Sequence, residues 1–545
     1  MAKTKEKKKN GLNYKQTFLI GFGFMGCMLM WSVYNSYVPV IFRAKLTELT
    51  GSGTALPGFL SVALIVNAIM TIDNIFGVIF QPYFGKRSDR TKSKLGKRMP
   101  YIIVCLPICA IFFSLIPVMA TIKAAALSII LMMTVIIFFN FTMSVWRSPV
   151  VSLMPDFTPS HLQSDANAVI NIMGGIGQMV GFVIGTIATA LCGLLGFTAM
   201  QTALKAKTNT LGQILELDAD GNPVVEWLGD KSLVSAEKLE NFLASGRDVL
   251  TVDGTEVCKK VAKLGEDGQP VYVNYTPIFL IAGIVSVLCL IILIVFYKKN
   301  KDNDLSAKVE LDANTADEKS KKIKIKDLPI SKDEKKSLLI MLASLFLINN
   351  ATEAIVPNFT NFALDTLDVK PIYSTLMMAV FAVSLAAFGI PAGTMGRKLG
   401  RKKTIMIGLG VIVAMFAVYL SVSQFSNSKT FTWIVLWIAL VVGGAAVGCI
   451  NINTLPLVLA IGGREYVGTF TGYYYTATFS AAITGPILCG LVIGLFNDDY
   501  NFMFLFCAIM FAIGLAVISR VRHGEMSKDE DQTWLDEAVE AASDD

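Results

Sequence analysis

Charged residues are scarce in this 545-residue sequence: Asp, Glu, Lys and Arg make up 17% of it, whereas hydrophobic residues make up 53%. The mean hydropathy of +0.57 lies outside the range of soluble globular chains. The formal net charge is +6, but the basic residues cluster in short loops between apolar runs, so we expect no nucleic-acid partner. The composition therefore predicts a polytopic membrane protein.

Motifs for enzymatic or metal chemistry are also missing. The sequence has no Walker lysine motif, no HExxH motif and no nucleophile elbow. Its nine cysteines are scattered, without a CxxC pair or metal-ligand spacing, and most lie in apolar segments, which is typical of small buried hydrophobes. We therefore expect no enzyme, no metal site and no organic cofactor.

Twelve apolar stretches are long enough to cross a bilayer as helices, which takes about 20 residues each. The predicted fold class is an all-α polytopic membrane protein with twelve transmembrane helices in two six-helix halves. The expected spans are about 16–42, 57–84, 100–120, 125–146, 166–197 and 276–297 in the first half, and 336–363, 371–395, 404–424, 431–457, 468–496 and 502–520 in the second.

The distribution of basic residues predicts the orientation in the membrane. Lys86 to Arg98 contains seven Lys or Arg, and Lys298 to Lys336 contains twelve lysines. Since loops rich in Lys and Arg stay on the cytoplasmic side, we expect both termini in the cytoplasm and the chain in the plasma membrane.

Two polar inserts predict how the chain is divided. An external insert should form a small folded cap, in which LDADGNPVVEW predicts a tight turn between short strands and SAEKLENFLASG a short helix. The expected parts are a cytoplasmic N-tail at 1–15, an N-terminal half at 16–297 with the extracellular insert at 198–275, a cytoplasmic linker at 298–335, a C-terminal half at 336–520 and an acidic cytoplasmic tail at 521–545.

Two acids lie deep in predicted spans. An acid at mid-membrane depth costs roughly 2.5–3.5 kcal/mol, so it normally faces the bundle interior, a partner or a water-filled path. Asp73 shares one helical face with Gly77 and Gln81, and Glu353 shares another with Asn350, where we expect it to be buried. Dry surroundings favour the protonated form of a carboxyl group, and water or a cationic partner favours its release of the proton. Asp73 and Glu353 are the candidate cation-coupling residues; structural acids hydrogen-bonded to neighbours are the alternative.

Several motifs resemble one family of transporters. Gly85-x-x-x-Asp89-Arg90 followed by Gly96-Lys97-Arg98 resembles the loop signature of the major facilitator superfamily, stretched as in the glycoside–pentoside–hexuronide:cation symporters and the related sucrose/proton symporters. Other matching stretches are Gln81-Pro82, Arg147-Ser148-Pro149, Met154-Pro155-Asp156, Ala166-Asn167-Ala168 leading into Met173-Gly174-Gly175, and Gly468-Thr469-x-Thr471-Gly472-x-Tyr474-Tyr475.

The resemblance implies a rocker-type symporter that brings a sugar inward with a proton or a sodium ion. In melibiose-permease-like members helix-two aspartates take part in cation binding, and Asp73 matches one such position. Those members carry more than one acid on helix two, whereas only Asp73 lies deep here. The resemblance therefore favours H⁺ as the coupling ion, with Na⁺ as the alternative.

A sugar site requires aromatic faces and side-chain amides around an otherwise apolar cavity. Trp31 and Asn35 share a helical face, while each amide taken alone suits a helix–helix hydrogen bond as well as it suits a ligand contact. The candidate substrate-binding residues are Trp31, Tyr34, Asn35, Asn67, Gln81, Asn350, Asn358 and Asn453.

The charged loop from Lys86 to Arg98 suits a conformational gate. The alternative is a charge cluster that serves only to orient the chain in the membrane. A charge near a helix end contributes about 0.3–1 kcal/mol, which is enough to bias two conformations that differ by a few kcal/mol. Arg147 should end the fourth span and form a gate contact or a helix-end ion pair with Asp156. The candidate gate residues are Gly85, Asp89, Arg90, Gly96, Arg98, Arg147, Asp156 and, in a weaker second copy of the signature, Arg397.

The sequence and the resemblance together predict a secondary active transporter, monomeric in the lipid bilayer. It would import a disaccharide or oligosaccharide such as an α-glucoside by proton symport. One alternative keeps the fold and makes the protein an exporter or a lysolipid carrier. The other is a membrane receptor that binds a ligand with its external insert and transports nothing.

Overall fold

The computed structural model describes residues 13–523 apart from short internal ranges. The ranges it leaves out are 52–60, 92, 94, 159–162, 198–200, 202–203, 205, 208–212, 245–248, 253–254, 265–270, 301–329, 368, 370, 426–428, 463–466 and 497. Most of the predicted tails, most of the linker and parts of the insert therefore lie outside the described residues.

Long apolar segments form helices because a helix satisfies its own backbone hydrogen bonds, as a lipid environment demands. The N-terminal part of the chain forms α1 (Tyr14–Gly51), α2 (Val62–Met70), α3 (Ile72–Asp89), α4 (Met99–Ala120), α5 (Ala125–Phe157), α6 (Gln163–Leu194) and, after the insert, α9 (Thr276–Asn300). The C-terminal part forms α10 (Lys332–Leu367), α11 (Pro371–Ala387), α12 (Gly389–Leu399), α13 (Arg401–Phe425), α14 (Lys429–Gly462), α15 (Val467–Leu495) and α16 (Phe502–Ile518).

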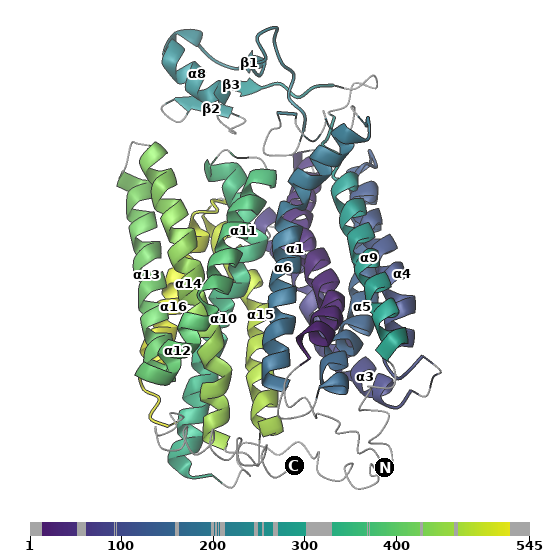
Figure 1. The fold of residues 1–545 in the computed structure, drawn as a ribbon. Coiled ribbons are helices and arrows are strands. Elements are labelled where there is room, and N and C mark those ends of the chain that lie inside the picture. Colours follow the sequence, from purple (N-terminus) through teal and green to yellow (C-terminus); the bar gives the residue numbers. More distant parts are fainter. Residues whose placement is uncertain are drawn as a thin grey trace, which may run out of the picture.

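Two helical bundles stand side by side, one from each part of the chain (Figure 1). Each bundle packs around its own cluster of buried apolar side chains, and the C-terminal cluster also takes in Ala63 and Phe182 from the N-terminal bundle. We call these bundles the N half and the C half. The end at which α1 begins is called the inner end, and the opposite end, where the insert lies, the outer end.

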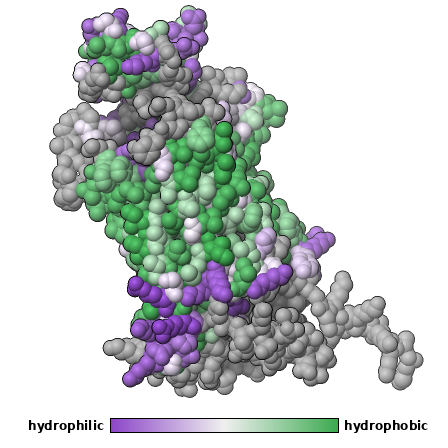
Figure 2. Space-filling model, turned by 90° about the vertical axis from the view of Figure 1, so that its left-hand side faces the viewer, coloured by the Kyte–Doolittle hydropathy of each residue, from purple (hydrophilic) through white to green (hydrophobic). Residues whose placement is uncertain are grey.

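A hydrophobic band surrounds the helices between more polar regions at the two ends (Figure 2). Ten helices of the described chain are long and apolar enough to cross a membrane. Two shorter apolar helices, Tyr373–Ala387 and Phe502–Ile518, lie where the eighth and twelfth spans were predicted. The chain is thus a multi-pass membrane protein, and the number of twelve spans stays a prediction.

The second span of each half is broken, which the sequence did not predict. Thr71 separates α2 from α3, and Phe388 separates α11 from α12. Both outer pieces reach the other half: α2 packs chiefly on α15, and α11 packs on α6 as well as on α14 of its own half. The inner pieces pack chiefly within their own half, α3 on α5 and α12 on α13 and α14.

Gly177 on α6 permits the close packing of α1 on α6 in the N half. A Cβ atom at Gly177 would collide with the backbone carbonyl of Met25 on α1. We therefore expect Gly177→Ala to lower the free energy of unfolding by about 1–3 kcal/mol, the usual cost of overpacking. Thermal unfolding in detergent measures this loss. Gly175→Ala is the matched control, because a Cβ atom there meets nothing within 4 Å, and equal stability of the two variants would contradict the prediction.

The insert folds as a small α/β cap, as the sequence predicted. It contains β1 (Val225–Trp227), a 3₁₀ helix (Lys231–Leu233), α8 (Ala236–Ala244), β2 (Val249–Val252) and β3 (Thr255–Lys260). The three strands form an antiparallel sheet in the order β1-β3-β2. The predicted turn is also present, since Leu217 pairs with Pro223 across Gly221, which has a φ of 79°.

The cap is anchored to the N half at Lys45, near the outer end of α1. Its ammonium group pairs with Glu48 at 2.9 Å and lies 4.5 Å from the centre of the Tyr272 ring in the insert. Burial raises the pKa of Tyr272 to about 12, so its hydroxyl stays neutral at physiological pH. The insert leaves α6 and returns to α9, both in the N half, yet its strands and α8 lie above the helices of the C half in Figure 1.

Candidate functional site

Asp73 lies in the first turn of α3, directly after the break at Thr71. Its side chain is buried, and its Oδ1 accepts a hydrogen bond of 2.6 Å from the backbone N–H of Asn74. The positive end of a helix dipole and the N–H groups of a first turn favour a carboxylate. The break therefore supplies part of the polar surroundings that a buried acid requires.

Arg147 lies within α5, ten residues before its last residue Phe157, and not at the end of a helix as predicted. Its guanidinium carbon is 4.2 Å from the centre of the Trp31 ring on α1, which is a cation–π contact. The predicted pairing of Arg147 with Asp156 is wrong, because Asp156 instead pairs with Arg98. The fourth helix continues beyond its predicted end at residue 146, so Arg147 and Asp156 belong to one continuous helix.

Glu353 on α10 brings a second acid to Arg147 from the other half. Asp73, Arg147 and Glu353 are close enough to one another to interact electrostatically. Glu353 is exposed, contrary to the prediction that it is buried, although it lies midway along α10. The exposed Glu353 side chain therefore lies near charged groups of the N half without being covered by them.

Two aromatic residues of α1 complete this part of the N half. Tyr34 is buried, interacts electrostatically with Asp73 and accepts a 3.5 Å hydrogen bond from the amide of Asn140 on α5. Its ring stacks on Phe139 with the ring centres 5.3 Å apart. Trp31 is half-buried beside Arg147. The structure thus brings Trp31 and Tyr34 to the same charged site, which we call the central triad for its members Asp73, Arg147 and Glu353.

The predicted substrate amides divide into two groups. Asn67 and Asn358 are buried and donate hydrogen bonds to each other, at 2.9 and 2.7 Å. Asn350 accepts a hydrogen bond from Thr484, and Asn453 donates to the carbonyls of Ala392 and Cys449. In this conformation each of these four amides is hydrogen-bonded to another protein group. The other two, Asn35 and Gln81, are half-buried.

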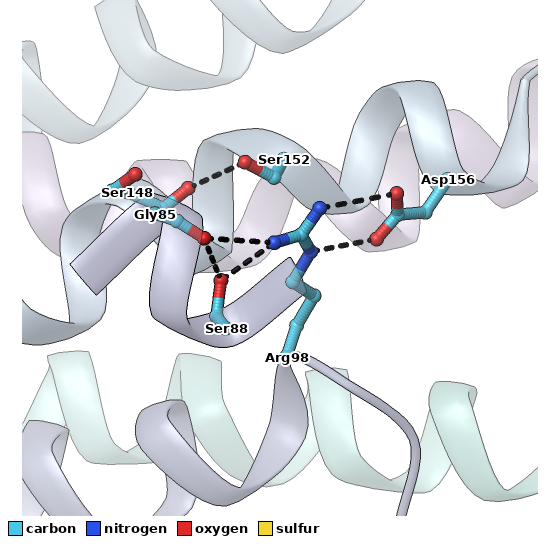
Figure 3. Close-up of polar contacts among 6 residues, drawn as sticks. All are labelled: Gly85, Ser88, Arg98, Ser148, Ser152 and Asp156. Carbon is cyan, nitrogen blue, oxygen red and sulfur yellow. Dashed lines mark hydrogen bonds and ion pairs between the residues drawn. The ribbon is translucent and has the colours of Figure 1, made fainter. Parts of the chain in front are cut away.

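The predicted gate contains a buried ion pair at the inner end (Figure 3). Arg98 Nε donates to Asp156 Oδ2 at 2.9 Å, and Nη2 donates to Oδ1 at 3.5 Å. Its Nη1 donates to Ser88 Oγ at 2.5 Å and to the carbonyl of Gly85 at 3.5 Å. One guanidinium therefore ties the inner ends of α3 and α5 together. Ser88, which was not among the predicted gate residues, is part of this contact.

Gly96 turns the chain into α4 just before Arg98. Its φ is 82°, a left-handed conformation that favours glycine, and a Cβ atom there would collide with the Tyr297 hydroxyl. Arg90 is exposed. The side chains of Asp89 and Arg397 lie outside the described residues, so their roles in the gate stay predictions.

A further ion pair, which was not predicted from the sequence, joins the halves. Arg43 near the outer end of α1 pairs with Asp365 near the outer end of α10, with 2.6 Å between Nη2 and Oδ2. The available signal was an Arg and an Asp at the outer ends of the first and seventh spans. Nothing in the sequence pairs residues that are 322 positions apart.

Comparisons with known proteins fit this architecture. Residues 339–536 match the family model described as Major Facilitator Superfamily, and residues 19–212 match the model described as MFS/sugar transport protein. No curated protein sequence matches the chain.

Solved structures of transporters have a similar fold. The nucleoside transporter NupG is 12% identical, with a TM-score of 0.54 over 94% of this chain and 100% of that chain. A D-xylose–proton symporter is 11% identical, with a TM-score of 0.54 over 94% and 97% of the two chains. A bacterial homologue of the iron transporter ferroportin, in an inward-facing state, is 10% identical, with a TM-score of 0.54 over 94% and 99%. At these identities the likeness concerns the fold alone.

Proposed function

Because this chain belongs to the major facilitator superfamily, we propose that it is a secondary active transporter that imports a sugar by proton symport. The observation that carries the proposal is the central triad, in which one cation from the N half interacts electrostatically with an acid of each half. The sugar, in our proposal, is a disaccharide or oligosaccharide such as an α-glucoside. The match to a sugar-transport family model supports that substrate class.

The central triad suits proton coupling because its charges do not balance. Arg147 carries one positive charge, and two carboxylates compete for it. A carboxyl group without a cationic partner in dry surroundings favours its neutral form. We infer that a proton on Asp73 lets Arg147 interact more strongly with Glu353, and that loss of the proton reverses this preference. Proton binding is thereby linked to a contact between the halves.

The conformation of the protein supports alternating access. Side-chain contacts that join the halves, such as Arg43 with Asp365 and Asn67 with Asn358, lie toward the outer end. The Glu353 side chain, which interacts electrostatically with groups of the N half, is nevertheless exposed. We therefore interpret this state as closed at the outer end and open toward the inner end. Trp31, half-buried beside Arg147, is the aromatic surface on which a sugar ring would stack.

Uptake into proteoliposomes tests the proposal. Purified protein is reconstituted, and uptake of labelled maltose or sucrose is measured with an imposed pH gradient, with a sodium gradient and with neither. We expect sugar to accumulate only under the pH gradient and to leak out when a protonophore is added. Protein-free liposomes give the background. Uptake that depends on neither ion gradient would reject symport. Accumulation under the sodium gradient alone would show that the coupling ion is Na⁺ and not H⁺.

A further inference from the structure

Arg43 forms a two-point ion pair between the two halves. Its Nη1 and Nη2 atoms donate to Oδ1 and Oδ2 of Asp365, at 2.7 and 2.6 Å. The two side chains are only 15% and 21% exposed. Two parallel hydrogen bonds of this kind fix both distance and orientation, and limited exposure protects the pair from screening. The pair therefore differs from an ordinary surface salt bridge, which contributes little.

The C half surrounds this guanidinium with further groups. The buried Tyr500 ring has its centre 5.0 Å from the guanidinium carbon of Arg43. Asp498, in the turn between α15 and α16, is close enough to interact with Arg43 electrostatically. A base of the N half thus enters a socket of two carboxylates and one aromatic ring in the C half. We call Arg43, Asp365, Asp498 and Tyr500 the outer latch.

A second contact between the halves lies beneath the outer latch. The amides of Asn67 and Asn358 exchange hydrogen bonds, and a Cβ atom at Gly490 would meet the Asn67 side chain at 2.9 Å. The Cys489 thiol lies 3.9 Å from Asn358 Nδ2 and is fully buried. If the outer ends separate, the outer latch and this amide pair both break, and the Cys489 thiol becomes accessible from outside.

We propose that the outer latch holds the external side of the protein closed, and that its release is the step that admits outward opening. Withdrawal of Arg43 leaves two carboxylates without their cation, so the open state is disfavoured until solvent reaches them. The strength of the outer latch therefore sets the ratio of inward-open to outward-open molecules. This inference rests on the alternating access of the proposed function, but not on the identity of the substrate or of the coupling ion.

Labelling of the native Cys489 thiol tests the outer latch without any substrate. Wild-type protein and Asp365→Asn are exposed from the outside to a membrane-impermeant maleimide, and the rate of labelling at Cys489 is read by peptide mass. We expect Asp365→Asn to label roughly five- to a hundredfold faster than wild type, the range of typical conformational couplings. Cys489→Ser identifies the signal, and Asp365→Glu, which keeps the charge, should restore slow labelling.

Glu48→Gln is the matched control. Glu48 forms an ion pair of similar length with Lys45 at the same outer end, but both residues belong to α1 in the N half. Its labelling rate should equal that of wild type. Equal rates for Asp365→Asn and wild type, with both proteins monodisperse in detergent, would overturn the proposal. Fast labelling in a protein that takes up no sugar would retain the outer latch and reject the proposed function.

Discussion

Asp73→Asn is expected to abolish proton-driven accumulation of sugar. Asparagine keeps the size of the side chain and its ability to accept the Asn74 N–H, but it cannot carry a proton. For one proton per sugar, a gradient of one pH unit is worth about 1.4 kcal/mol and supports about a tenfold accumulation ratio. The ratio should fall to about one in the variant. Sugar exchange without a gradient should continue, because Trp31 and Arg147 are unchanged.

Two companion variants sharpen this experiment in proteoliposomes. Asp73→Glu restores a titratable carboxyl group and should recover part of the accumulation. Glu48→Gln removes a carboxylate that lies outside the central triad and should leave the ratio at its wild-type value. A ratio unaffected by Asp73→Asn would remove Asp73 from the coupling mechanism. If Glu353→Gln alone then lowered the accumulation ratio to about one, the coupling acid would belong to the C half.

Arg98→Ala is expected to cause the largest loss of stability among single substitutions at the inner end. Arg98 and Asp156 are about nine-tenths buried, and removing one partner leaves the other charge buried without this cation. Breaking such a pair typically costs about 3–5 kcal/mol. Ser88 and the Gly85 carbonyl would lose their donor as well. The measurement is thermal or denaturant-induced unfolding of the purified protein in detergent.

Two other substitutions separate the lost charge pair from a general effect of truncation. The double variant Arg98→Ala, Asp156→Ala removes both charges and should be more stable than Arg98→Ala alone. Arg87→Ala removes an arginine that is exposed and forms a hydrogen bond with Tyr83. Since no buried charge loses its partner, this variant should be nearly as stable as wild type. Equal stability of Arg98→Ala and Arg87→Ala would show that the buried pair contributes nothing.

The positions of the spanning helices were predictable because bilayer thickness sets the length of an apolar helix. The apolar runs therefore predicted the helices, and the turn and short helix of the insert were recognisable from their residues. The break at Phe388 is followed by Gly389 and Pro391, and a proline removes a helix hydrogen bond, so a signal for this break was present in the sequence. The break at Thr71 was not predictable, since no proline or glycine lies next to it. There the two pieces of the second span pack against different halves, which is decided by tertiary contacts.

The candidate site was predictable as a set of residues but not as a set of partners. Asp73 and Glu353 stand out because acids are costly in apolar segments. Arg147 was placed with Asp156 because the two are near in sequence, whereas the structure pairs Asp156 with Arg98, 58 positions away. The outer latch was invisible for the same reason. Ion pairs between separate helices depend on how the helices are arranged, which a single sequence does not state.

The divided second span of the N half has its joint, Thr71, next to the central triad. A straight helix moves as one rod, so a span that packs on both halves would resist their separation at either end. Here α2 packs chiefly on α15 of the C half, whereas α3 packs chiefly on α5 of its own half. Asp73 is the second residue beyond its joint. A bend at Thr71 that moved the inner end of α3 would therefore also reorient the Asp73 carboxylate.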